Sequence, residues 1–222
     1  MVKNKPVYSF EEADSKNRML LGGKGAGLSE MTRLKLPVPA GFTITTEVCN
    51  KYYDNNKKLP KDLMPAVMKN IAKMEKKTGK KWNSIKNPLL VSVRSGAATS
   101  MPGMMDTILN LGLNEQTVEG FAEQTKNPRF SWDSYRRFIQ LFGKVVFGVN
   151  DEKFDHVLDA VKEKQGITDD SKLNVESLKA IVLQYKKICE EHTKRKFPDT
   201  PDEQLVLSIE AVFKSWMGER AI

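Results

Sequence analysis

Residues 91–107 read VSVRSGAATSMPGMMDT, and this stretch says more about the fold than any other. It begins in an apolar run, 89–93, that is typical of a buried strand and ends abruptly on Arg94. A strand that carries a guanidinium to its end, beside a loop of small residues, is suited to bind a polyphosphate, because Arg makes planar, permanently charged contacts with phosphate oxygens. The stretch alone fits equally well a core strand whose terminal Arg reaches solvent.

A second stretch, LGGKGAGL at 21–28, precedes a segment that suits a helix, 28–34. Glycines around Lys24 would leave backbone N–H groups open at a helix start, where the helix dipole favours an anion. It is not a Walker A loop, because Arg18 and Gly25 stand where that motif needs Gly and Ser or Thr. It is not a dinucleotide fingerprint either, because Leu28 replaces the last glycine. A glycine-rich turn with a solvated lysine explains the stretch in isolation equally well.

Taken in order, four motifs resemble one family. They are GGKGAGL at 22–28, LPVPAGF at 36–42, VRSGA at 93–97 and SMPGMMDT at 100–107. This series is similar to the pyruvate phosphate dikinases, and NLGLN at 110–114 and AVFKSW at 211–216 extend the likeness over nearly the whole chain. Phosphoenolpyruvate synthases share the lysine loop and the Val-Arg-Ser strand end, but usually lack the methionine-rich run.

The resemblance implies an α+β fold, namely the first lobe of an ATP-grasp nucleotide-binding domain with an inserted all-helical subdomain. We expect the lobe in residues 1–113, the helical insertion in 114–197, and a C-terminal helix that returns to the lobe in 198–222. The family's chains are several times longer. We therefore expect this chain to be a fragment without the second grasp lobe, whose acidic residues hold Mg²⁺, and without the phosphohistidine and pyruvate-binding domains.

The family's reaction converts ATP, phosphate and pyruvate to AMP, pyrophosphate and phosphoenolpyruvate. A histidine takes the β-phosphoryl group, and the γ-phosphate leaves on inorganic phosphate. Carried over to this sequence, the resemblance assigns Lys24 and Arg94 to the ATP polyphosphate as catalytic residues. The expected nucleotide-binding set is Gly22, Gly23, Lys24, Gly25, Gly27, Arg94, Ser95, Gly96, Met101, Gly103 and Thr107. Ala98 departs from the family, in which an Arg often follows Ser-Gly-Ala.

The composition fits a soluble, cytoplasmic domain. The chain has 222 residues, 40% of them hydrophobic, no apolar run long enough to span a bilayer and no apolar signal region. Cys49 and Cys189 lie far apart in sequence, which favours reduced thiols. The partners implied by the resemblance are ATP and the phosphohistidine domain of the same longer protein, and a homodimer is compatible with it.

The net charge of +8 raises the question of nucleic-acid binding. Much of the excess is local, in Lys69, Lys73, Lys76, Lys77, Lys80 and Lys81. Met64, Val67, Met68 and Ile71 recur among them at helical spacing, which indicates an amphipathic helix over 62–77 with a basic solvent face. No aromatic ladder or zinc-finger spacing accompanies the lysines, so we expect no nucleic-acid partner.

Periodicity predicts the remaining elements. Strands are expected at 7–10, 38–45, 89–94 and 107–111, and a helix at 46–55 capped by Thr45 or Thr46. Three apolar stripes, within 135–146, 154–161 and 175–189, predict core-facing helices, and a last helix is expected at 205–216 after the proline-rich break 197–201. His156 and His192 are expected on solvent-facing sides of helices, and no metal-ligand spacing is present.

Two alternatives remain at this stage. One has the same chemistry, a phosphoenolpyruvate synthase or an α-glucan water dikinase, and the methionine-rich run argues against both. The other is a non-catalytic basic module that binds nucleic acid or a partner protein.

Overall fold

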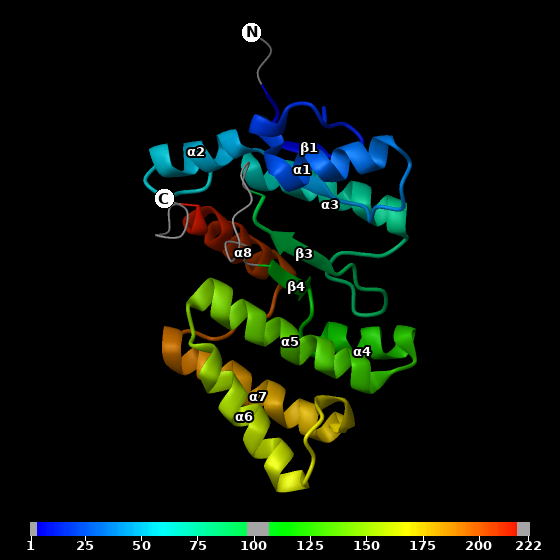
Figure 1. Cartoon of the computed structure of the whole chain (residues 1–222), viewed down its shortest axis with the longest axis vertical. Coiled ribbons are helices and arrows are strands. Elements are labelled where there is room, and N and C mark those ends of the chain that lie inside the picture. The colour runs from blue at the N-terminus through cyan, green and yellow to red at the C-terminus, as the bar shows by residue number, and fades with distance from the viewer. Residues whose placement is uncertain (1–3, 97–106, 217–222) are drawn as a thin grey trace. The chain divides into compact units, whose positions relative to one another are not determined.

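A computed structural model describes residues 4–96 and 107–216 of the chain (Figure 1). The described residues form two compact units. The first unit contains 4–80, 94–96 and 212–216, and the second contains 81–93 and 107–211. The three-part division expected from the sequence has other boundaries and stays a prediction.

The first unit is built on a small antiparallel sheet. Strand β1 (Val7–Ser9) pairs with β2 (Phe42–Ile44) so that Tyr8 lies opposite Thr43. Helices α1 (Arg18–Arg33) and α3 (Leu63–Thr78) contact β2 and β1 respectively, and α2 (Thr46–Asp54) packs on α1. The core of this unit includes the buried side chains of Val7, Leu21, Val48, Tyr52, Leu63, Val67 and Ile71.

The predicted basic helix is confirmed as α3, which ends at Gly79 in the left-handed conformation (φ 72°). Its buried side includes Val67 and Ile71, whereas its lysines are exposed. Two of those lysines form ion pairs with the segment after β1: Lys73 Nζ lies 2.5 Å from Glu12 Oε1, and Lys77 pairs with Glu11. Part of the local positive charge is therefore neutralised within the unit.

The second unit combines a two-stranded sheet with helices. Strands β3 (Val91–Arg94, of which Arg94 belongs to the first unit) and β4 (Thr107–Leu111) are hydrogen-bonded neighbours. The helices are α4 (Glu115–Thr125), α5 (Pro128–Phe147), α6 (Asp151–Gln165), a 3₁₀ turn (Asp170–Lys172), α7 (Val175–Thr193) and α8 (Pro201–Ser215). Central helix α5 packs against α4, α6, α7 and β4. All three predicted stripes supply its core, with Tyr135, Phe138, Ile139, Phe142, Phe154, Leu178, Ile181 and Tyr185 fully buried.

Asparagine side chains start four of these helices. Asn114, Asn127, Asn150 and Asn174 each accept a hydrogen bond from a backbone N–H of the first turn, which satisfies donors that the helix itself leaves open. The position of the cap predicted at Thr45 is confirmed, since Thr45 is the N-cap residue of α2, but its side chain makes no capping hydrogen bond.

Proline chemistry sets two boundaries. The strand expected over 38–45 covers only Phe42–Ile44, since Pro37 and Pro39 lack the N–H that a sheet ladder needs. The last helix, expected after the proline-rich break, begins at Pro201 because the fixed φ of proline suits the first helical position. That helix runs into the first unit, where the Tyr53 hydroxyl donates to the Phe213 carbonyl over 2.6 Å.

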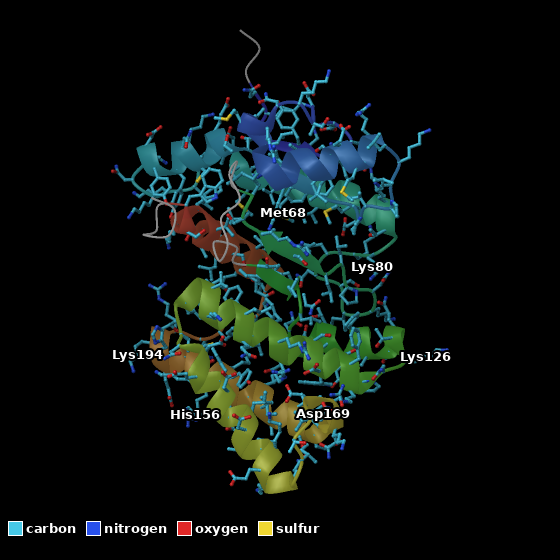
Figure 2. All side chains as sticks on the ribbon, viewed as in Figure 1. Met68, Lys80, Lys126, His156, Asp169 and Lys194 are labelled. Carbon is cyan, nitrogen blue, oxygen red and sulfur yellow. The ribbon has the colours of Figure 1, made fainter. Side chains whose placement is uncertain are left out.

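The histidines and cysteines are not site candidates. His156 on α6 (Figure 2) and His192 on α7 are exposed, as predicted. Cys49 and Cys189 are buried and free, and burial raises the pKa of each thiol to about 12, which makes them poor nucleophiles. Among the described residues, no helix combines the length and apolar character that a membrane span requires.

A buried glutamine joins α8 to β4 within the second unit. The side chain of Gln204 is completely buried, accepts from the Gly112 N–H at 3.0 Å, and donates to the carbonyls of Leu113 and Pro198 at 3.0 Å. Gln204→Ala is expected to lower the free energy of unfolding by roughly 2–3 kcal/mol, because it leaves buried backbone groups without partners. Urea unfolding measures this loss. Gln184→Ala, at an exposed position of α7, is the matched control and should change stability little.

Candidate functional site

The glycine-rich stretch lies inside helix α1, not in a loop before it. The helix runs over Arg18–Arg33 and is broken at one residue, Gly22, whose φ of 71° and ψ of 168° are not helical. Lys24 therefore lies in the first turn after the break, and the expected helix start at residue 28 is wrong. The low helix propensity of glycine suggested a loop, but burial of Ala26 and Ser29 against the unit outweighs that cost.

Gly22 brings the two predicted motifs together. A methyl group on Gly22 would lie 1.6 Å from the carbonyl oxygen of Gly96, so the backbones at these positions touch. Positive φ and close approach both require glycine here. The break in α1 and the segment just after strand β3 thus form one close backbone contact within the first unit.

Lys24 and Arg94 are electrostatic neighbours at this contact. The pKa of Lys24 is lowered, first by burial of the ammonium group and second by the positive charge of Arg94. Lys24 is partly buried and Arg94 is exposed. Within residues 4–96 and 107–216, no carboxylate forms an ion pair with either side chain. Two neighbouring like charges, for which the described part of the chain provides no counter-ion, are suited to bind a polyanion.

The backbone next to Arg94 is only partly covered by the described residues. Among residues 4–96 and 107–216, no atom lies within 4 Å of where a methyl group on Gly96 would be, whereas Ser95 before it is buried. The first turn of α1 after Gly22, which contains Lys24, also carries the positive end of a helix dipole, which favours an anion. The arrangement can bind phosphate oxygens through two charged side chains and open backbone.

The remaining predicted residues divide into three groups. Gly25 has a packing role, since a methyl group there would lie 2.7 Å from Oγ1 of Thr43. Gly27 is exposed and has open space, and Gly23 is partly buried next to the break. Thr107 begins β4 in the second unit. Met101, Gly103 and the departure at Ala98 lie outside the described residues.

Two threonines that the sequence did not single out support the site. The side chain of Thr43 on β2 faces Gly25, and Thr46 Oγ1 at the start of α2 donates to the Met19 carbonyl at 2.7 Å. These contacts join residues about 20 to 30 positions apart, and no local pattern reveals them. No cluster of three or more His, Cys, Asp or Glu side chains that could hold a metal occurs in the described parts of the chain.

The coupling between the two cations can be measured. Arg94→Ala should raise the pKa of Lys24, because it removes the second of the two causes that lower it, while burial keeps the pKa below its usual range. Titration of ¹³C-labelled lysine followed by NMR reports this pKa directly. An unchanged Lys24 titration in Arg94→Ala would contradict the electrostatic coupling of the two side chains.

Comparison with known proteins identifies relatives. The family described as pyruvate phosphate dikinase, AMP/ATP-binding domain, matches residues 18–58 and 55–222. The chain is similar to the pyruvate, phosphate dikinases of Entamoeba histolytica (53% identical over 216 residues), Giardia intestinalis (52% over 222) and Clostridium symbiosum (48% over 217). Each alignment covers 97% of this chain but only 24–25% of the relative.

The chain thus spans about a quarter of the length of the curated relatives it matches. The family match extends over both units and includes the Gly22 break, Lys24 and Arg94. The alternatives from other classes of protein are not supported by this match, which covers nearly all of the chain. On the combined grounds of sequence and fold, the chain belongs to the pyruvate phosphate dikinase AMP/ATP-binding domain family.

Proposed function

We propose that this chain binds ATP and that Lys24 and Arg94 hold the triphosphate. The observation that carries the proposal is geometric: Gly22 and Gly96 are in close backbone contact, which brings the segments of Lys24 and Arg94 together, and the described residues provide neither cation with a counter-ion. Each cation can form charge-assisted hydrogen bonds to phosphate oxygens. Lys24 must be protonated to do so, so affinity for ATP is expected to fall as the pH rises through its lowered pKa.

We further propose that the chain is the nucleotide-binding part of a longer enzyme. That enzyme would convert ATP, phosphate and pyruvate to AMP, pyrophosphate and phosphoenolpyruvate through a phosphohistidine, as the motif resemblance implies; the relatives are named pyruvate, phosphate dikinases. In phosphoryl transfer a protein mainly positions the groups and neutralises developing charge. Lys24 and Arg94 would perform both tasks at the triphosphate, and the phosphohistidine domain would be a partner within the same polypeptide.

The other predicted contacts belong to the same proposal. Gly23, Gly27, Ser95 and Gly96 would let backbone or hydroxyl groups approach the nucleotide. Met101, Gly103 and Thr107 are kept as nucleotide-binding residues on the family resemblance alone. Mg²⁺ would accompany the triphosphate, with its protein ligands in the part of the longer enzyme beyond this chain. A cytoplasmic location fits the two free thiols, and dimerisation would be a property of the full-length protein.

Calorimetric titration of the chain with ATP and Mg²⁺ tests the proposal. We expect weak, saturable binding of one ATP, and no formation of AMP when phosphate and pyruvate are added. Oligonucleotide binding that falls with salt, in the absence of ATP binding, would instead support the basic-module alternative. Release of AMP and pyrophosphate by the chain would contradict the assignment of catalysis to the longer enzyme.

A further inference from the structure

The position of Lys24 depends on a segment that makes no direct contact with phosphate in the proposed function. This segment, 43–46, contains the end of β2 and the start of α2. It meets α1 on both sides of the Gly22 break. Upstream of the break, Thr46 Oγ1 donates to the Met19 carbonyl at 2.7 Å. Downstream, the side chain of Thr43 lies against Gly25, the residue after Lys24.

The contact at Gly25 is close. A methyl group on Gly25 would lie 2.7 Å from Thr43 Oγ1, 2.8 Å from Cγ2 and 3.3 Å from Cβ. A threonine side chain is stiff about χ1, because two heavy atoms branch from Cβ. Its position is fixed further by the β1–β2 pairing, in which Thr43 lies opposite Tyr8. Thr43 is therefore a rigid surface on which the first turn of the helix rests.

We propose that Thr43 is a positioning residue for the ATP site, since its branched side chain sets the depth at which Gly25 packs and thereby aims Lys24 at the space beside Arg94. Gly25 is glycine because any side chain would lift this turn from β2. Thr46 fixes the other side of the break. Together with the Gly22–Gly96 contact, the turn is held at three points. The inference rests on the proposed function of Lys24.

The test is a complementation experiment on the chain. Gly25→Ala should weaken ATP binding about tenfold, since a small displacement of a charged group costs much of its interaction. Gly25→Ala combined with Thr43→Ala should restore affinity to within about twofold of the unchanged chain, because only the 3.3 Å contact with Cβ remains. Gly25→Ala combined with Thr43→Val is the matched control and should stay weak, because valine keeps the γ-branch.

The NMR titration of Lys24 provides a second readout that overall stability does not determine. Its pKa should change in Gly25→Ala and return in the double alanine variant. ATP binding of Gly25→Ala equal to that of the unchanged chain, or failure of Thr43→Ala to restore a folded Gly25→Ala protein, would overturn the positioning role. If the unchanged chain does not bind ATP, the proposed function fails. The Lys24 titration then still decides the positioning role, since an identical curve in Gly25→Ala would refute it.

Discussion

Lys24→Ala is expected to weaken ATP binding by roughly 10- to 100-fold, the factor that corresponds to losing one charge-assisted interaction worth about 1.5–3 kcal/mol. Arg94→Ala should have an effect of the same order. Both cations are proposed to act on one polyanion, so removal of either lowers the affinity for ATP. Because neither pairs with a described carboxylate, its removal leaves no described carboxylate without its partner. Calorimetric titration with ATP at constant ionic strength measures both changes.

The double variant of Lys24 and Arg94 makes this test more specific. If the two cations bind one triphosphate, the loss in the double variant should differ from the sum of the single losses, because each charge affects the other. Lys51→Ala, an exposed lysine on α2 in the same unit, is the matched control and should bind ATP normally. Equal affinities of Lys24→Ala and Lys51→Ala for ATP would contradict the assignment of the site.

Gly22→Ala is expected to have the largest effect on stability, a loss of roughly 2–5 kcal/mol. About 1–2 kcal/mol comes from forcing a side chain into left-handed φ, and about 1–3 kcal/mol from displacing neighbouring backbone. The displaced group is the Gly96 carbonyl, which lies 1.6 Å from the site of the new methyl carbon. Since the chain has two compact units, hydrogen exchange of amides in α1 and α3 reports the first unit separately.

Gly27→Ala is the matched control for stability. Gly27 is in the same helix, is exposed, and has open space where a methyl group would be added. Alanine there should stabilise the helix by about 0.5–1 kcal/mol, the usual preference for alanine over glycine. Destabilisation by both substitutions to a similar extent would show that the break at Gly22 is not the special position that the structure indicates.

Amphipathic elements could be predicted because their signal is local. The boundaries of strand β4 at Thr107–Leu111 are as expected, and those of α3 differ by one residue at each end. The apolar stripe of α5 also predicted which of its residues are buried, including Phe138 and Phe142. In each case the 3.6-residue or two-residue period is contained in a short window of sequence.

The start of α1 could not be predicted, since glycine is a poor helix former and the contacts that favour a helix there come from distant residues. Packing of Gly25 on Thr43 involves residues 18 positions apart, and the contact of Gly22 with Gly96 involves residues 74 apart. Sequence analysis therefore assigned all the glycines one role. The structure separates them into a conformational break at Gly22, a packing position at Gly25 and an open position at Gly27.

The sequence by itself determined the family, the amphipathic helices and the two cationic side chains proposed to bind phosphate, because motifs, periodicity and charge are written in neighbouring residues. Only the tertiary structure decided that Lys24 and Arg94 are close enough to interact. It alone also showed that Thr43 and Thr46 contact helix α1 on either side of its break at Gly22. The physical reason is that such contacts depend on how separate segments pack against one another. No short-range pattern in a single chain specifies which backbone atoms will touch after folding.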